Sequence, residues 1–401
     1  MTGRSLLLIA DAFYPGEIPP ECKTNTHLAL ALGKRGWKVS VWAGHGARVP
    51  SCSVNVRIVR STRFWGVAEA LRIFVWLILN RPRQVILMYH VELYSNRPNI
   101  NWVPIMARLV GVHSVTLFTS GVKPRRSTIQ DRLFSLLGYG ALLKHPVGPL
   151  GASNKMVFYC DENRNQLLGM DQSSLKACSE ISTPPNTLPV NSLTDKYSIR
   201  ASLGLTDKDL LVGYFGLIYP GKGIEWLLEA MWILKNKGLA AKLIIVGPNG
   251  AVTANEQWNL ACRNYELSIK RRVEDLDIKD LIIWAGFCED FKAVEFLSSC
   301  NVACLPFDRG LTNQRSSFIT CAQIGLPVIT TLTPATDGSL RDPDSGIIYV
   351  EPKNSAQIAD HIILFNEDRE MTLRRGSMLK CFAAKHYRNE RFVDCFDMAC
   401  P

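Results

Sequence analysis

Residues 211–235 read LVGYFGLIYPGKGIEWLLEAMWILK, and this stretch predicts the architecture of the second half of the chain. Its first five residues, Leu211–Phe215, form a short apolar run typical of a buried strand, and Ile224–Lys235 is expected to be a helix. The turn between them contains glycines, one proline and a single lysine, Lys222. A strand, a glycine-rich turn and a helix in this order are typical of a βαβ unit.

The same alternation runs on both sides of this stretch. A proline-rich segment, Ser182–Pro189, interrupts it near the middle of the chain and marks a domain boundary. We therefore predict an α/β fold of two Rossmann-like domains, with parallel sheets facing an interdomain cleft. The N-terminal domain would cover residues 1–185 and the C-terminal domain 186–380, and a helix in 381–401 would be free to pack back on the first domain. The other expected elements are strands at Leu6–Ala10, Lys38–Trp42, Val54–Val59, Val85–Tyr89, Ser114–Phe118, Met156–Cys160, Ala241–Val246, Leu281–Ala285, Val302–Pro306 and Val328–Thr330, and helices at Thr26–Arg35, Val67–Leu79 and Val103–Val110.

The composition of the 401 residues excludes several classes of protein. Hydrophobic residues make up 47% and charged residues 20%, as in a folded globular chain and unlike a disordered or collagen-like one. No stretch approaches the roughly 20 apolar residues of a membrane-spanning helix. The 12 cysteines are scattered and form no Cys-x-x-Cys pair, so neither a zinc site nor a disulfide framework is expected, and a reducing cytoplasm fits best.

The net charge of +10 comes from the first half of the chain. Residues 1–185 hold 22 Lys and Arg against 10 Asp and Glu, a balance of +12, whereas residues 186–401 hold 24 against 26, a balance of −2. This asymmetry indicates either an anionic partner of the first domain or an ordinary solvated surface. No Arg/Lys-rich helix or aromatic RNA-binding motif accompanies the charge, which disfavours nucleic acid. The apolar run Ile73–Leu79 likewise has two interpretations, as part of a core helix or as a membrane contact.

Two strand-to-helix turns in the second half carry residues that suit a phosphate. One holds Lys222 just before a helix, and the other, Asp308–Phe318, holds Arg315, Ser316 and Ser317 before another helix. Backbone amides at a helix N-terminus bind anions together with a nearby cation. The alternatives are a solvated lysine and a serine that only caps its helix. Two such turns in one domain favour a diphosphate.

Several motifs follow one another in a set order along the chain. They are Leu28–Val39 in the first half, then Gly213–Gly216, Tyr219–Glu225, Leu227–Ala230, Leu243–Gly247, Trp284–Phe287 and Gly325–Thr330. Together they resemble the family 4 retaining glycosyltransferases, which have two Rossmann-like domains (the GT-B fold). More narrowly, Gly310–Thr330 and Tyr89–Pro104 resemble a bacterial polysaccharide-synthesis subgroup, although Gln314 replaces the first of the two arginines typical of that subgroup.

The resemblance implies an N-terminal acceptor domain and a C-terminal domain that binds a nucleotide sugar. By matching positions, the donor diphosphate would contact Gly216, Lys222, Arg315, Ser316, Ser317 and Phe318. Phe287 and Cys288 would border the base, and Thr312 and Thr320 stand where many members carry glutamates for the donor sugar and the ribose. On the acceptor side, Thr119 and Ser120 replace a His-Asp pair, and Lys123 follows them. The candidate catalytic residues are Lys222, Arg315 and His90, the last at the end of an expected strand.

We therefore predict a glycosyltransferase that moves a sugar from a nucleotide-diphosphate-sugar donor to an envelope or extracellular polysaccharide precursor, with retention of anomeric configuration. No cofactor and no metal are expected, because Asp342-Pro343-Asp344, which has the spacing of an acidic metal motif, falls in a proline- and glycine-rich turn. The expected partners are the nucleotide sugar and a glycan or lipid-linked acceptor. The expected location is the cytoplasm, with a peripheral anionic contact at the inner face of the cell membrane left open. The alternative, motivated by Thr119, Thr312 and Thr320, is a catalytically inactive nucleotide-sugar-binding or scaffold subunit of a polysaccharide assembly complex.

Overall fold

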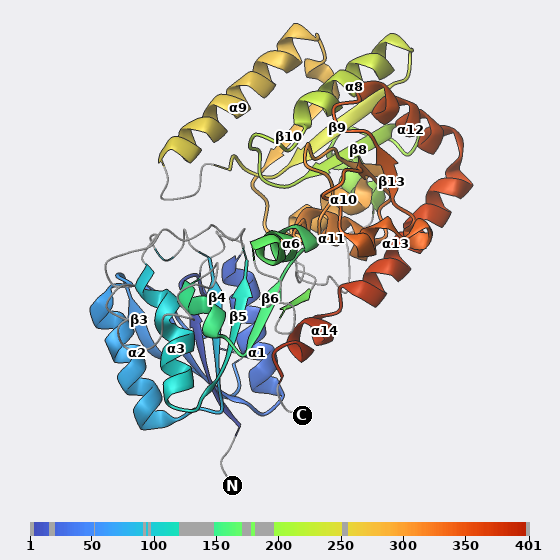
Figure 1. Ribbon diagram of the computed structural model, residues 1–401. Coiled ribbons are helices and arrows are strands. Elements are labelled where there is room, and N and C mark those ends of the chain that lie inside the picture. Colours follow the sequence, from blue (N-terminus) through green and yellow to red (C-terminus); the bar gives the residue numbers. More distant parts are fainter. Residues whose placement is uncertain are drawn as a thin grey trace. The chain divides into compact units, whose positions relative to one another are not determined.

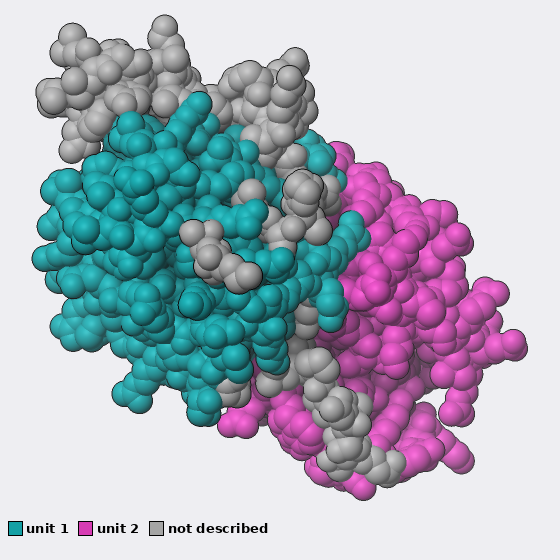
Figure 2. Space-filling view, turned by 90° about the horizontal axis from the view of Figure 1, so that it is seen from below, with its two compact units in different colours: residues 1–182, 389–401 teal, residues 183–388 magenta. Residues whose placement is uncertain are grey.

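The computed structural model of the chain describes residues 4–15, 21–51, 53–90, 94, 98–119, 148–170, 178–180, 196–250 and 256–397. The chain divides into two compact units, residues 1–182 with 389–401 (unit 1) and residues 183–388 (unit 2), as Figure 1 and Figure 2 show. Each unit contains a parallel sheet with helices on its faces, so the predicted α/β fold of two Rossmann-like domains is confirmed.

The described strands of unit 1 form one parallel sheet in the order β3-β2-β1-β4-β5-β6-β7. The chain starts at β1 in the middle, moves outward through β2 and β3, and then returns to β4 on the other side of β1. Open α/β sheets bind ligands at such a reversal, beyond the carboxyl ends of the strands. The strands are β1 (Ser5–Ala10), β2 (Lys38–Gly44), β3 (Val56–Thr62), β4 (Gln84–Tyr89), β5 (His113–Phe118), β6 (Lys155–Phe158) and β7 (Cys178–Glu180).

Helices cover both faces of this sheet (Figure 1). On one face, α2 (Val67–Asn80) and α3 (Val103–Leu109) pack through Ile73, Leu77 and Val103 against Leu7 and Ile9 of β1. On the other face, α1 (Glu21–Lys34) packs through apolar side chains such as Leu28. A further α-helix described within residues 4–180 is α6 (Asp161–Met170).

The C-terminal segment also belongs to unit 1. In α14 (Asn389–Asp394), Phe392 and Val393 are buried in the same core as α1. The Arg35 guanidinium donates to Asp394 Oδ1 at 2.7 Å, and the indole N–H of Trp37 donates to Asp397 Oδ1 at 2.9 Å. The segment 381–401 is therefore not one helix, because its first residues complete α13 (Arg369–His386) of unit 2 and the chain passes to unit 1 at residue 389.

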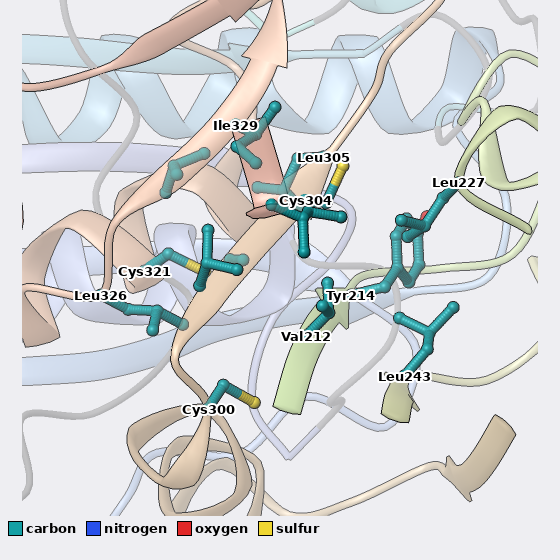
Figure 3. Close-up of a cluster of buried hydrophobic side chains, with 14 of the residues drawn as sticks. Val212, Tyr214, Leu227, Leu243, Cys300, Cys304, Leu305, Cys321, Leu326 and Ile329 are labelled. Carbon is teal, nitrogen blue, oxygen red and sulfur yellow. The ribbon is translucent and has the colours of Figure 1, made fainter. Parts of the chain in front are cut away.

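Unit 2 has a parallel sheet of described strands in the order β10-β9-β8-β11-β12-β13, with its reversal between β8 and β11. Cys300, Cys304 and Cys321 lie among the apolar side chains of its core (Figure 3), and burial raises the pKa of the Cys300 thiol to about 12. These cysteines therefore serve as small apolar core residues. The strands are β8 (Leu210–Phe215), β9 (Ala241–Val246), β10 (Ile282–Gly286), β11 (Val302–Leu305), β12 (Val328–Thr331) and β13 (Ile348–Val350), and the helices are α7 (Lys196–Ser202), α8 (Ile224–Asn236), α9 (Glu256–Asp275), α10 (Asp290–Ser299), α11 (Ser316–Ile324), α12 (Ser355–Glu367) and α13 (Arg369–His386).

Two predicted element boundaries were wrong. Helix α1 begins at Glu21 instead of Thr26. Its first residues bury Cys22 and the polar side chains of Thr24 and Asn25, so the apolar pattern that predicts a helix is missing there. Strand β3 is shifted toward Val56–Thr62, since its pairing with β2 starts at Val56 and leaves Val54 exposed. Neighbouring strands set such boundaries more than the local sequence does.

Candidate functional site

The loop after β8 is shaped by glycines that no other residue could replace without strain. Gly216, Gly221 and Gly223 have φ angles of +136°, +91° and +70°. A methyl group on Gly223 would lie 1.9 Å from the carbonyl oxygen of Pro306, which directly follows β11. The loop therefore lies against the segment that leaves the neighbouring strand, at the reversal of the sheet where ligands are expected.

Lys222 points into this junction instead of into solvent. Its side chain is buried, with 6% of the residue exposed, and its Nζ lies 4.8 Å from the ring centroid of Tyr219 and 5.0 Å from that of Phe307. Burial lowers the pKa of the Lys222 ammonium, and the nearby Arg315 lowers it further, against the opposite effect of Tyr219. The alternative of a solvated lysine is therefore wrong.

Arg315 reaches the same junction from the loop after β11. Its guanidinium carbon lies 4.8 Å from the Phe307 ring centroid, and its Nη1 donates to the Tyr219 hydroxyl at 3.4 Å. Its Nε is buried and has no hydrogen-bond partner among the described residues. Burial raises the pKa of the Tyr219 phenol, but the charges of Lys222 and Arg315 outweigh burial and hold this pKa below its usual value.

No ion pair compensates these two cations within the described part of the chain. A buried charge is costly unless it is paired with an opposite charge or hydrogen-bonded. The junction is therefore a desolvated, positively charged site with an unused donor on Arg315, and an anion would compensate it.

The N-terminus of α11 lies beside this site. The helix begins at Ser316, and its N-cap residue, Arg315, makes no side-chain capping bond, so neither serine caps the helix as the alternative held. A methyl group on Gly216 would lie 3.6 Å from both Lys222 Nζ and Ser317 Cβ, which places these three residues around one point. Free amides at a helix N-terminus add to the attraction for an anion.

The amides of this helix start are not equally available. The Ser316 amide donates to the Gln314 carbonyl at 3.0 Å, and the Phe318 amide donates to the Arg315 carbonyl at 2.9 Å. The Phe318 ring is fully buried in the core. The Ser317 amide donates to no described residue, so it is the amide of this turn left to bind a ligand.

The two threonines assigned to the donor sugar and ribose are both buried. The Thr320 hydroxyl donates to the Ser316 carbonyl one helical turn earlier, at 3.0 Å. Thr312 lies in the loop before Arg315, and its carbonyl accepts the Arg315 amide at 3.0 Å. Both residues thus contribute to the shape of the loop that carries Arg315.

Phe287 and Cys288 follow β10 at the same edge of the sheet. Phe287 is 54% exposed, whereas Cys288 is half-buried and its thiol donates weakly to the Ala285 carbonyl at 3.6 Å. Burial raises the pKa of the Cys288 thiol. An exposed aromatic ring such as that of Phe287 is a group on which a planar base can stack.

In unit 1, His90 follows β4 and Asp11 follows β1, so both stand at the reversal of that sheet. The Asp11 carboxylate accepts a hydrogen bond from the Trp65 indole. Burial raises the pKa of Asp11, and this bond and the nearby His90 oppose the rise. Asp11 is not among the residues predicted from the sequence, although a carboxylate directly after a first parallel strand is a signal that points to it.

The remaining predicted acceptor-side residues follow β5. The Thr119 hydroxyl and amide both donate to the Tyr89 carbonyl at 3.1 Å, so Thr119 joins the ends of β4 and β5. Ser120 and Lys123 lie outside the described residues. Asp342 accepts the Asp344 amide at 2.9 Å and caps a short turn, as its proline-rich surroundings indicated.

Comparison with known proteins shows that the chain is similar to glycosyltransferases. Residues 195–377 match the family model described as glycosyl transferases group 1, and no curated protein sequence matches the chain. Among solved structures, the chain is similar to HepE of Anabaena in complex with UDP, with a TM-score of 0.69, 14% identity and 98% of each chain covered. It is also similar to a glycosyltransferase from Rickettsia africae, with a TM-score of 0.70, 13% identity and 99% and 97% covered. A third similar structure is WaaG, a glycosyltransferase involved in lipopolysaccharide biosynthesis, with a TM-score of 0.62, 12% identity and 98% and 100% covered.

The two units together therefore have the GT-B fold of glycosyltransferases. The match of residues 195–377 to the glycosyl transferases group 1 model agrees with the resemblance seen in the sequence motifs.

Proposed function

We propose that this protein is a retaining glycosyltransferase that uses a nucleotide-diphosphate sugar and acts on an envelope or extracellular polysaccharide precursor. The observation that carries the proposal is the buried Lys222 beside the partly buried Arg315, neither of which has a carboxylate partner in the described part of the chain. A diphosphate supplies the missing negative charge, and the Ser317 amide and Arg315 Nε supply hydrogen bonds to it. Anabaena HepE has been solved with UDP and with UDP-glucose, which makes uridine donors the first to test.

In this proposal the chain acts mainly by stabilising charge. As the bond between the anomeric carbon and the diphosphate breaks, negative charge grows on the leaving phosphate beside Lys222 and Arg315. The acceptor hydroxyl attacks from the same face and passes its proton to that phosphate, which retains the configuration without a carboxylate nucleophile. His90 and Asp11, at the sheet reversal of unit 1, are the candidates for orienting the acceptor.

The proposal includes no resident cofactor and no metal. A glycan or lipid-linked precursor would be the acceptor, and the protein would act in the cytoplasm at the inner face of the cell membrane. WaaG, one of the similar structures, is described as involved in lipopolysaccharide biosynthesis, which supports an envelope acceptor.

A catalytically inactive nucleotide-sugar-binding or scaffold subunit is the second candidate. The threonines at positions 119, 312 and 320 favour it, because their hydroxyls or backbones are used within the fold and none replaces a lost carboxylate.

The test separates binding from turnover. Thermal unfolding is measured with UDP, ADP, GDP and the corresponding sugar donors, and hydrolysis of each stabilising donor is then followed by release of the nucleotide. Stabilisation with donor hydrolysis, reduced about 10–1000-fold in Lys222→Ala, is expected for the enzyme. Stabilisation without hydrolysis or transfer to any envelope extract would favour the scaffold. The absence of any stabilisation would refute both.

A further inference from the structure

The side of α2 that faces away from the sheet of unit 1 is apolar along the helix. Its side chains Val67, Leu71, Val75, Ile78 and Leu79 are 55%, 56%, 53%, 42% and 76% exposed. They are spaced by four, four, three and one residues, so they line one side of the helix. The opposite side buries Glu69, Ala70, Ile73 and Leu77. We call this exposed row, together with Phe64 just before the helix, the α2 outer face.

This pattern differs from that of an ordinary surface helix. A helix that covers a sheet normally presents polar side chains to water, whereas α2 is apolar on both sides. Phe64, which is 74% exposed, stands three positions before the first residue of the helix. Contiguous exposed apolar patches on soluble domains mark sites of contact with proteins or membranes.

The chain around α2 is positively charged. Residues 38–90 contain Lys38, Arg48, Arg57, Arg60, Arg63, Arg72, Arg81 and Arg83 but a single carboxylate, Glu69. Glu69 is buried, and it accepts hydrogen bonds from Arg60 Nε at 2.7 Å and Arg72 Nη1 at 2.8 Å. Burial raises the pKa of Glu69, but the hydrogen bonds from Arg60 and Arg72 outweigh burial and hold this pKa below its usual value. The segment therefore offers no exposed negative charge.

We infer that the α2 outer face inserts into the surface of an anionic lipid bilayer, with its axis along the membrane plane. The apolar row would enter the boundary between headgroups and acyl chains, while arginines at both ends of the helix, Arg63, Arg81 and Arg83, contact lipid phosphates. A second copy of this chain fits less well, because it would bring two positive segments together without a carboxylate to pair them. No helix in the described ranges is both long and apolar enough to cross a bilayer.

This contact deepens the proposed location at the inner face of the cell membrane, and its test is independent of the donor site because binding to lipid requires no donor and no turnover. If the proposed acceptor is lipid-linked, the same contact brings the protein to it.

The apolar contribution is tested by flotation with vesicles of phosphatidylglycerol and phosphatidylcholine, and with phosphatidylcholine alone. The double variant Leu71→Ser, Val75→Ser should bind the anionic vesicles about 10–100-fold more weakly than the wild type. Leu260→Ser, Leu267→Ser on α9 is the matched control, since both leucines are 53% exposed and lie in unit 2. The control should bind like the wild type.

The charge contribution has its own pair of variants. Arg81→Gln, Arg83→Gln should weaken binding by about fivefold for each charge removed. Arg263→Gln, Arg271→Gln, two exposed arginines on α9, should leave binding unchanged. About 0.5 M salt should reduce wild-type binding, because it shortens the screening length to a few ångströms.

Several outcomes would overturn the inference. The first is that the wild type does not bind anionic vesicles at low salt. The second is that the α2 and α9 variants lose vesicle binding equally. The third is that the wild type is a dimer, that Leu71→Ser, Val75→Ser makes it a monomer, and that neither protein binds vesicles. Thermal stabilisation by UDP, measured on every variant, reports folding and the donor site separately. A failed donor site would abolish that response in all proteins and leave vesicle binding intact.

Discussion

Replacement of Lys222 by methionine should change the stability of the free protein and its response to UDP in opposite directions. Methionine keeps the apolar stem that packs near Tyr219 and Phe307 and removes the ammonium. Burial lowers the pKa of that ammonium, which means that the folded protein disfavours its charge. Without a ligand, Lys222→Met should therefore unfold at the same temperature as the wild type or at a higher one.

With UDP the result should reverse. An ammonium that hydrogen-bonds a phosphate contributes about 1.5–3 kcal/mol, so its loss should raise the Kd about 10–150-fold. UDP at 100 times the wild-type Kd stabilises the wild type by about 2.7 kcal/mol, and a 100-fold weaker variant by about 0.4 kcal/mol. For units of this size these values correspond to a rise in Tm of about 5–11 °C and of less than about 2 °C.

Differential scanning fluorimetry with a UDP titration measures both effects. Lys279→Met is the matched control, because Lys279 is exposed in the short turn before β10, and it should show the wild-type response. An undiminished UDP response in Lys222→Met would refute the diphosphate site. A ligand-free Lys222→Met that unfolds far below the wild type would show instead that the ammonium stabilises the fold.

Three further outcomes are expected. Arg315→Lys should lower both UDP affinity and turnover about tenfold or more, because lysine keeps the charge but loses the guanidinium contact with Phe307 and the hydrogen bond to Tyr219. A wild-type Kd for UDP by calorimetry together with a wild-type turnover number would contradict this. UDP affinity should fall as the pH rises through the pKa of Lys222, which burial holds below the ordinary lysine value of about 10.4, because the diphosphate binds the protonated form. Over the same interval the unfolded state binds more protons than the folded one, so the free protein should gain stability with rising pH, and Lys222→Met should abolish both trends. Finally, Gly223→Ala should lower the free energy of unfolding of unit 2 in urea by more than about 3 kcal/mol, since its methyl group would lie 1.9 Å from the Pro306 carbonyl oxygen. Gly221→Ala, which has open space around it, should lower it by only about 1 kcal/mol. Equal losses of stability in the two variants would contradict the loop geometry.

The order of strands and helices could be read from the sequence because each element is encoded locally. A run such as Leu211–Phe215 followed by glycines and an amphipathic segment has few alternatives to a strand, a turn and a helix. The alternation of these elements then leads to parallel sheets with right-handed crossovers. The two turns that we propose to bind the diphosphate could be found for the same reason, since Lys222 and Arg315 each follow a strand and precede a helix.

The chemistry of the site could not be read in this way. Lys222 and Arg315 are 93 positions apart, and their shared contacts with Tyr219 and Phe307 arise only where β8 and β11 become neighbours at the reversal of the sheet. The same is true of Asp11 and His90 in unit 1.

Helix α2 illustrates the same division. Its hydrophobic composition is visible in the sequence, and it suits a core helix as well as a membrane contact. Packing against the sheet buries Ile73 and Leu77, so the core interpretation holds for one side of the helix. It leaves Leu71 and Val75 in solvent, and that side carries the membrane contact that we propose. Secondary structure depends on neighbours along the chain and is visible in the order of residues. Burial, pKa shifts and uncompensated charge depend on neighbours in space, and these exist only once the sheets have formed.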